Sequence, residues 1–209
     1  APACHPGMAC CASSGTGSTC GGAGPATQGN DSGTDTGAGN PINLITGNKF
    51  QREVDLAPLP GVLGLELIRY YNSADDDRRL LGRGWRLSYE TTLQARAGSL
   101  QITQADGTRL IFGQTLLRPD TYRARAPLQG LVRALAAPRG TEHVWTWADG
   151  RQLRFNRAGK LEHIRAPSGE FVSLRYDGRG WLVEVTDPAG RRLGRPPAGP
   201  RTEPRVHAR

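Results

Sequence analysis

Cysteine is confined to the first twenty residues of this 209-residue chain, and residues 21–209 contain none. Disulfides therefore cannot hold the main body together, so its fold must depend on the burial of apolar side chains. In an exported protein the four cysteines allow three disulfide pairings, and their spacing lacks the Cys-x2-Cys pairs of structural zinc sites. We expect disulfides or free thiols, and no metal, at Cys4, Cys10, Cys11 and Cys20.

Long apolar runs are also missing from the sequence. One apolar stretch, residues 63–68, is interrupted by Gly64 and Glu66, so we predict no membrane-spanning segment.

Catalytic motifs are absent as well. The chain has no Gly-x-Ser-x-Gly elbow, no His-Glu-x-x-His pair and no Gly-rich phosphate loop that ends in Lys-Ser or Lys-Thr. Three adjacent carboxylates at residues 75–77 lack a partner histidine, so they indicate a solvated, charged loop. The histidines are interpreted as ordinary surface or edge-strand residues: His5, His143, His163 and His207. We therefore expect a protein that is not an enzyme and that binds no cofactor or metal.

Positive charge is unevenly distributed along the chain. The formal net charge is +8, and six arginines against one glutamate place +5 of it in residues 191–209. The remainder is nearly balanced and lacks the basic face or the base-stacking aromatic pattern of a nucleic-acid-binding module. We expect no specific nucleic-acid partner, although such a tail would attract polyanions without specificity.

Glycine and proline are abundant, with 28 and 15 residues, and helical periodicity is scarce, which indicates an all-β fold rich in turns. Residues 85–93 alternate between apolar and polar side chains and predict one half-buried strand. Gly-containing segments at 97–99 and 105–107 predict hairpin turns. Residues 127–138 begin and end with proline, which leaves about ten residues, too few for a stable helix by itself, so we predict a strand there.

Two tandem copies of one pattern occupy residues 155–193, with a constant offset of 21 residues. Each copy has an aromatic residue, Asn or Asp, Gly, an apolar run, a Pro-x-Gly turn and a second apolar run. Asn156 and Asp177 can hydrogen-bond their own backbone, and Gly159 and Gly180 accept positive φ, so each copy predicts a β-hairpin. A single hairpin cannot bury its apolar face, so the copies must stack in an extended sheet.

These motifs resemble those of a known family. The string Tyr176-Asp177-x-x-Gly180-x-Leu182, followed by Asp187-Pro188-x-Gly190-Arg191, is similar to the Rhs or YD repeat of bacterial and teneurin-type proteins. Three upstream motifs resemble the region that precedes the repeats in Rhs proteins: Gly39-Asn40-Pro41-Ile42-Asn43 with Thr46-Gly47-Asn48-Lys49, Arg69-Tyr70-Tyr71-Asn72-Ser73, and Leu81-Gly82-Arg83-Gly84-Trp85. The resemblance covers residues 39–193.

The resemblance implies an extended, curved sheet of antiparallel β-hairpins that contributes to a shell around a C-terminal toxin used in competition between bacteria. It implies a secreted or cell-surface protein whose partners are the remainder of the shell and the toxin. The motif residues would then be architectural and not catalytic: Asn40, Pro41, Gly47, Tyr70, Trp85, Tyr176, Asp177 and Gly180. The 209 residues include neither the many downstream repeats nor a toxin domain.

We divide the chain into four parts. Residues 1–39 are rich in Cys, Gly and Ser and predict a flexible leader and linker, and residues 40–154 form a β domain that precedes the repeats. Residues 155–193 are the two repeats, and residues 194–209 predict a Pro- and Arg-rich disordered tail. After Leu193 the pattern fails, so we expect the second copy to lose its closing strand at a truncated or out-of-frame end of a longer array.

A binding module is the alternative hypothesis. Trp145 and Trp147 fall on the same side of an expected strand, so an exposed aromatic pair could stack on carbohydrate. On this hypothesis the chain would be a secreted or cell-surface adhesion module with glycans as partners.

Overall fold

The structure, a computed structural model, describes residues 49–73 and 75–194. Within these ranges the chain forms antiparallel β-strands and one short 3-10 turn, so the all-β prediction is confirmed. The flexible leader predicted for residues 1–39 falls outside the described residues, as do the motif residues Asn40, Pro41 and Gly47. The disordered tail predicted for residues 194–209 also falls outside them except for Gly194, which lies in a strand, so the prediction is wrong at that residue.

In chain order the elements are β1 (Phe50–Leu56), β2 (Leu67–Asn72), β3 (Arg78–Arg79), β4 (Gly82–Arg83), β5 (Trp85–Leu87), β6 (Thr92–Arg96), β7 (Ser99–Thr103), β8 (Arg109–Gln114), β9 (Thr121–Ala124), η1 (Pro127–Gln129), β10 (Leu131–Ala137), β11 (Gly140–Thr146), β12 (Gln152–Phe155), β13 (Leu161–Arg165), β14 (Phe171–Tyr176), β15 (Leu182–Thr186) and β16 (Arg192–Gly194).

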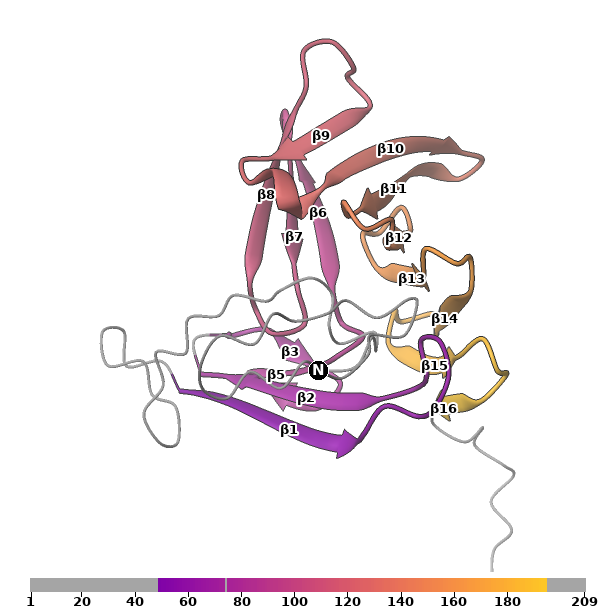
Figure 1. Cartoon of the computed structure of the whole chain (residues 1–209). Helices are drawn as coiled ribbons and strands as arrows, with labels where there is room; N and C mark the ends of the chain where they lie inside the picture. The colour runs from indigo at the N-terminus through magenta and orange to yellow at the C-terminus, as the bar shows by residue number, and fades with distance from the viewer. Residues whose placement is uncertain (1–48, 74, 195–209) are drawn as a thin grey trace, which may run out of the picture.

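The described strands form three sheets of different size. A three-stranded sheet has the order β1-β2-β5, a two-stranded sheet pairs β3 with β4, and an eleven-stranded sheet runs in sequence order from β6 to β16. In Figure 1 the large sheet rises through β6, β7 and β8, bends over at β9 and β10, and descends through β12 to β16, while β1 and β2 cross below. Each pair of neighbours in this sheet is antiparallel, which confirms the predicted extended, curved sheet of hairpins.

One five-residue turn joins many of these strands. The backbone N–H of its first residue donates to the carbonyl of its fifth, and a glycine at its fourth position donates to the first carbonyl with positive φ. Glycine has no Cβ, so positive φ costs it little. The turn recurs at residues 104–108, 147–151, 156–160, 166–170, 177–181 and 187–191. The hairpin turns predicted from Asp, Asn, Pro and Gly are therefore confirmed.

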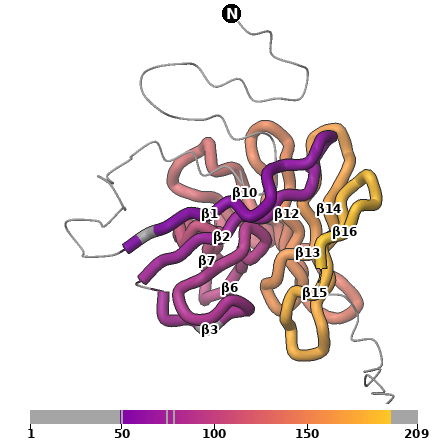
Figure 2. The backbone as a smooth tube through the Cα atoms, turned by 90° about the horizontal axis from the view of Figure 1, so that it is seen from below, coloured from indigo at the N-terminus to yellow at the C-terminus, as the bar shows by residue number. Residues whose placement is uncertain are grey.

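The large sheet curls back toward its own first strand. Leu93 in β6 donates its N–H to the carbonyl of Gly159 at 2.8 Å, and Thr92 forms a β-bridge with Lys160. The loop of residues 57–66, between β1 and β2, lies near β16 in both views (Figures 1 and 2). The sheet therefore bends far enough to bring its two ends near the N-terminal strands.

The core fills the space that the curled sheet surrounds. It combines inward-facing residues of the large sheet with Leu63, Leu65 and Tyr89, which come from the loop of residues 57–66 and the segment after β5. The largest fully buried side chains of the large sheet belong to this cluster: Leu100, Ile102, Phe112, Val132, Trp145, Leu153, Phe155, Leu161, Val172 and Val185. Leu63, Leu65 and Tyr89 thus pack inside the curve, where they are buried with the sheet.

The prediction of one strand at residues 85–93 is wrong. The chain leaves the three-stranded sheet after Leu87, turns through a Glu90 N–H to Leu87 carbonyl bond of 2.9 Å, and joins the large sheet at Thr92. The turn is further held because Glu90 Oε2 accepts from the Leu87 N–H at 2.8 Å. Ser88 is also fully buried, because both sides of this connection are covered by protein. Alternation of polar and apolar residues therefore did not mark one continuous strand here.

The two remaining strand predictions have different outcomes. Residues 127–138 contain strand β10, as predicted, after the 3-10 turn at Pro127–Gln129. The prediction that the second copy lacks its closing strand is wrong for the first residues of that strand, since β16 pairs with β15 over Arg192–Gly194. The predicted boundary between residues 154 and 155 falls inside strand β12 of the large sheet. The first repeat therefore belongs to the same sheet as the strands that precede it.

Candidate functional site

The repeat turns are held by the side chains that the sequence singled out. Asp177 Oδ1 accepts from the N–H groups of Arg179 and Trp181 at 3.0 and 2.8 Å. Asn156 Oδ1 accepts from Ala158 and Lys160 at 2.9 and 3.0 Å in the first copy. These bonds satisfy donors that would otherwise be left unpaired in the turn, so Asn and Asp serve the same local purpose.

Tyr176 connects the two repeats. Its hydroxyl donates to the carbonyl of Leu161 at 2.7 Å, and the ammonium of Lys160 lies 5.3 Å from the centre of its ring. Lys160 also donates to the carbonyl of Gly180, so the turn of the first repeat is bonded to the turn of the second. Burial raises the pKa of Tyr176, with smaller contributions from Glu90 and Glu162, so the hydroxyl stays protonated as a donor.

The motif residues of the pre-repeat region lie in the three-stranded sheet. Tyr70 in β2 is 8% exposed. The ring of Trp85 in β5 packs against Tyr71 at 5.2 Å between centroids and carries the Arg69 guanidinium 5.0 Å from its centre. These contacts tie β2 to β5, which is a structural task.

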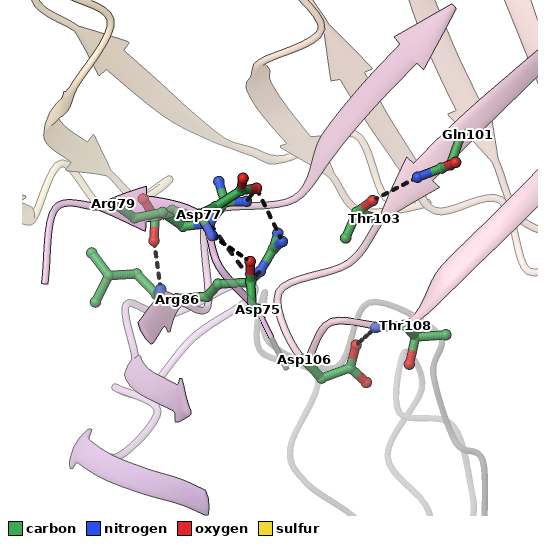
Figure 3. A network of polar contacts seen from close by, with 10 residues as sticks. Asp75, Asp77, Arg79, Arg86, Gln101, Thr103, Asp106 and Thr108 are labelled. Atoms are coloured by element: carbon green, nitrogen blue, oxygen red, sulfur yellow. Dashed lines mark hydrogen bonds and ion pairs between the residues drawn. The ribbon is translucent and has the colours of Figure 1, made fainter. Parts of the chain in front are cut away.

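Residues 75–77 are only partly the solvated loop that we predicted. Asp76 and Asp77 are mostly exposed, but the side chain of Asp75 is 11% exposed and accepts from Arg86 Nε at 2.6 Å. Figure 3 shows this carboxylate beside Arg86, with Arg79 and Asp77 in the same network. Burial alone would raise the pKa of Asp75, but hydrogen bonds from Arg86 and the Asp77 backbone hold it below its usual value.

Trp145 and Trp147 lie on the same side of their strand, but they are not an exposed pair. Trp145 is fully buried and Trp147 is 8% exposed, with 3.9 Å between their ring centroids. The Trp145 indole N–H donates to the Gln129 carbonyl at 2.7 Å, and Phe112 packs edge-on against its ring. The expectation of an exposed platform is therefore wrong, because the sheet curls over this side and makes it the core.

The histidines in the described ranges are not grouped around a reactive side chain. His143 is 8% exposed on the core side of β11, and His163 packs edge-on against Phe171 on the other face of the sheet. Burial lowers the pKa of both imidazoles. Across residues 49–73 and 75–194, no three His, Cys, Asp or Glu side chains are close enough to share a metal ion. His5 and His207 lie outside those ranges.

Membrane insertion through a helix has no candidate in the described part of the chain, where no helix is long and apolar enough to cross a bilayer.

A polar contact between the second repeat and the N-terminal strands was missed by sequence reasoning. The carboxylate of Asp187 is fully buried and accepts from the Arg191 N–H at 2.9 Å and from Arg191 Nε at 2.6 Å. Arg191 then donates through Nη2 to the carbonyl of Pro60 at 2.7 Å, across 131 residues of sequence. We call this arrangement the Asp187–Arg191 clasp. It fixes the loop of residues 57–66 to the end of the large sheet.

Burial would raise the pKa of Asp187, but the Arg191 side chain, the Arg191 backbone and the Leu65 backbone keep it below its usual value.

The clasp has a signature in the sequence. At the equivalent places of the first repeat stand Ala166 and Glu170. An Asp and an Arg present in one copy alone could have indicated a contact that only this copy makes.

Comparison with known proteins locates the same two regions. The profile of DUF6531, described as a domain of unknown function, matches residues 39–112, and the profile of the RHS Repeat matches residues 155–192. A protein of Burkholderia cenocepacia (strain H111), the double-stranded DNA deaminase toxin A, is 40% identical over 173 residues, which cover 74% of this chain. The alignment covers 11% of that relative, so the chain matches a small part of its length.

The two matched regions are the ones that the motifs indicated, and they occur in the same order. The residues between them form β9 to β12 of the same sheet that contains the repeats. The chain therefore carries a DUF6531 region followed by an RHS repeat, which is the organisation of an Rhs/YD-repeat protein.

Proposed function

We propose that this chain is a non-enzymatic, structural beginning of a β-shell that encloses or presents a C-terminal toxin, in an exported protein used in competition between bacteria. The observation that carries the proposal is the clasp together with the loop of residues 57–66, of which residues 63–66 are buried. The N-terminal segments occupy the inside of the curled sheet at the end where Arg191 holds Pro60. Such a plug closes one end of a hollow sheet without needing reactive groups.

The free end of the sheet supports the same proposal. Strand β16 pairs on one side with β15 and forms an edge of the large sheet. Beside it lies a largely apolar cavity of about 920 Å³, lined in part by Leu80, Leu81, Trp181 and Leu193. Unpaired edge strands invite pairing, and exposed apolar surface favours coverage. A further hairpin of the repeat type would pair with β16 and cover the apolar cavity. The sheet would then extend away from the end that the loop of residues 57–66 fills.

The toxin part of the proposal is supported by the relative, whose name is that of a toxin. It can be tested in a chimera in which this chain replaces the matching segment of the Burkholderia protein. We expect the chimera to resist limited proteolysis in its C-terminal part as well as the parent does. Weakening the plug by Asp187→Ala should make that part sensitive to protease, because the shell opens at the clasped end.

The matched control for the chimera is Asp149→Ala, which removes a carboxylate that is 46% exposed and pairs with Arg151 within one turn. This variant should keep the resistance of the chimera. Rapid digestion of the C-terminal part at the same rate in the parent, the chimera and the Asp187→Ala chimera would refute enclosure, since no shell would then be protecting that part.

A further inference from the structure

The face of the large sheet opposite the core carries a second cavity. Strands β9 to β14 alternate, so Val132, Trp145 and Leu153 face the core while their neighbours point to the other side. A groove of about 960 Å³ lies on that other side. Its lining residues come from strands β9 to β14 and their connections, whose course Figure 1 shows, and include neither Asp187 nor Arg191.

Positive charge dominates this groove. Four exposed arginines line it, and no aspartate or glutamate is among its lining residues: Arg123, Arg133, Arg154 and Arg165. Arg154 pairs with Glu142, which lies just outside the lining. Within the described ranges no ion pair is formed by the other three guanidinium groups. Exposed cations without counter-charges favour an anionic partner.

Strand register shows how the arginines are spaced. Arg133 is opposite Val144, which is opposite Arg154, so two strand intervals of about 4.8 Å place these two Cα atoms about 10 Å apart. In the adjacent row Arg123 and Arg165 are separated by Leu131, Thr146 and Gln152. Four intervals put them about 19 Å apart. The charges therefore flank a central part that carries no charge.

Apolar side chains form much of the remaining wall, beside the uncharged polar side chains of Thr146 and Gln152 and the imidazole of His163. Leu131, Leu135 and Val144 line the groove, and Phe171 is 51% exposed at one end. Strands β9 to β14 are paired on both sides, so a ligand cannot add as another strand and must bind through side chains. Stacking of successive bases needs several free aromatic faces, whereas the ring of Trp147 is stacked on Trp145 and Phe171 offers a single exposed ring.

From this combination we infer that the groove binds an acidic, amphipathic segment of a partner protein. Its carboxylates would pair with Arg133 and Arg165, and its apolar side chains would cover Leu131 and Val144. A helix of about 13 residues is about 20 Å long, which matches the span from Arg123 to Arg165. This binding surface is separate from the core side of the sheet, so it does not depend on what the shell encloses.

The test uses the whole 209-residue chain and a fluorescein-labelled amphipathic peptide of about 14 residues with Glu on one face and Leu on the other. We expect binding in fluorescence anisotropy, weakened at least about tenfold in the Arg133→Gln/Arg165→Gln double variant. Raising NaCl from about 50 mM to about 500 mM should also weaken it, because exposed charges are screened. A peptide with Gln in place of Glu should not bind.

The matched control is Arg96→Gln/Arg109→Gln, two exposed arginines in β6 and β8 that lie outside the groove. It should bind the peptide as the parent does, and far-ultraviolet circular dichroism should show both double variants folded. Three results would overturn the inference: no binding of the peptide, equal binding to both double variants, or tighter binding of a labelled oligothymidine that depends on Arg133 and Arg165.

Discussion

The two repeats have the same hairpin but different neighbours. Both turns make the same backbone bonds, with Gly159 at φ 71° and Gly180 at φ 79°. In the first copy Leu161 and Val172 are fully buried, whereas their counterparts Leu182 and Leu193 are only partly buried. The second copy instead contains the Asp187–Arg191 clasp. Identical local chemistry therefore serves an interior position in one copy and a terminal joint in the other.

Replacement of the turn glycines should separate the two copies most strongly. An added Cβ at Gly159 would lie 1.8 Å from the carbonyl oxygen of Leu93, whereas at Gly180 it would meet the end of the Lys160 side chain at 2.6 Å. We expect Gly159→Ala to lower the free energy of unfolding by about 4 kcal/mol, because a backbone contact must break in addition to the positive-φ strain. Gly180→Ala should cost about 1–2 kcal/mol, since Lys160 can move.

Urea unfolding of the two glycine variants measures this difference. Equal losses would mean that the contact between β6 and the first repeat's turn does not stabilise the fold.

Loss of the clasp should have the next largest effect. Asp187→Ala leaves the Arg191 guanidinium without its buried carboxylate, so we expect a loss of about 2–3 kcal/mol. The loop of residues 57–66 should also become a site of early proteolytic cleavage. Asp149→Ala is the control, because it removes an exposed pair with Arg151 and one turn bond from the Arg151 N–H, together worth about 1 kcal/mol. If both variants lose the same amount, the clasp does not secure the loop.

Exchange of the aromatic residues should have a smaller effect. Tyr176→Phe removes the hydroxyl that donates to Leu161, and we expect a loss of about 1–1.5 kcal/mol in thermal or urea unfolding. The first copy has Phe155 at the equivalent position, fully buried. Phe155→Tyr would bury a new hydroxyl in the apolar core, so it should also destabilise the protein. A gain of stability in Phe155→Tyr would show that the two positions are interchangeable after all.

Acidification should affect the two copies in different pH ranges, with the smallest effect of the four. The folded pKa of His163 is depressed, so its contribution is present above its unfolded pKa of about 6.5 and is lost as pH falls through the folded pKa. The pKa of Asp187 is also depressed, so its contribution is lost only as pH falls below about 4. His163 stands where the second copy has Glu184.

The measurement is the difference in unfolding free energy between the parent and His163→Gln from pH 7 to pH 5. The parent should lose more stability than the variant over this range. His143, whose pKa burial also lowers, adds to the same loss, whereas Glu90, whose pKa burial raises, opposes it. Parallel curves for parent and variant would contradict the assignment to His163.

The parts of the fold that were predictable are those set by nearest neighbours in sequence. Asn156, Asp177 and their glycines specify turns through bonds within five residues, so the hairpins followed from the sequence. The curling of the sheet did not, because it depends on contacts such as Leu93 with Gly159 that no local pattern encodes. The same contacts decide which face becomes the core, which is why Trp145 and Trp147 were wrongly expected at the surface.

The contacts at the joint were hardest to predict. Asp75 and Arg86 looked like members of a solvated loop and an outward-facing strand position, yet their ion pair is mostly buried. From sequence alone a charged residue is predicted to be exposed, because burial of an unpaired charge is unfavourable. An ion-pair partner offsets that cost, but the sequence does not show which residue is the partner. The difference between Ala166 and Asp187 was visible in the alignment of the two copies, but its meaning required the position of Pro60.

The bond between Arg191 and Pro60 also has a consequence for synthesis on the ribosome. Pro60 emerges 131 residues before Arg191. At roughly 5–20 residues per second, the loop waits several seconds or longer before its partner is made. During this time Leu63 and Leu65 cannot complete their native packing. The nascent chain must therefore carry an unfinished N-terminal module until the second repeat has been translated.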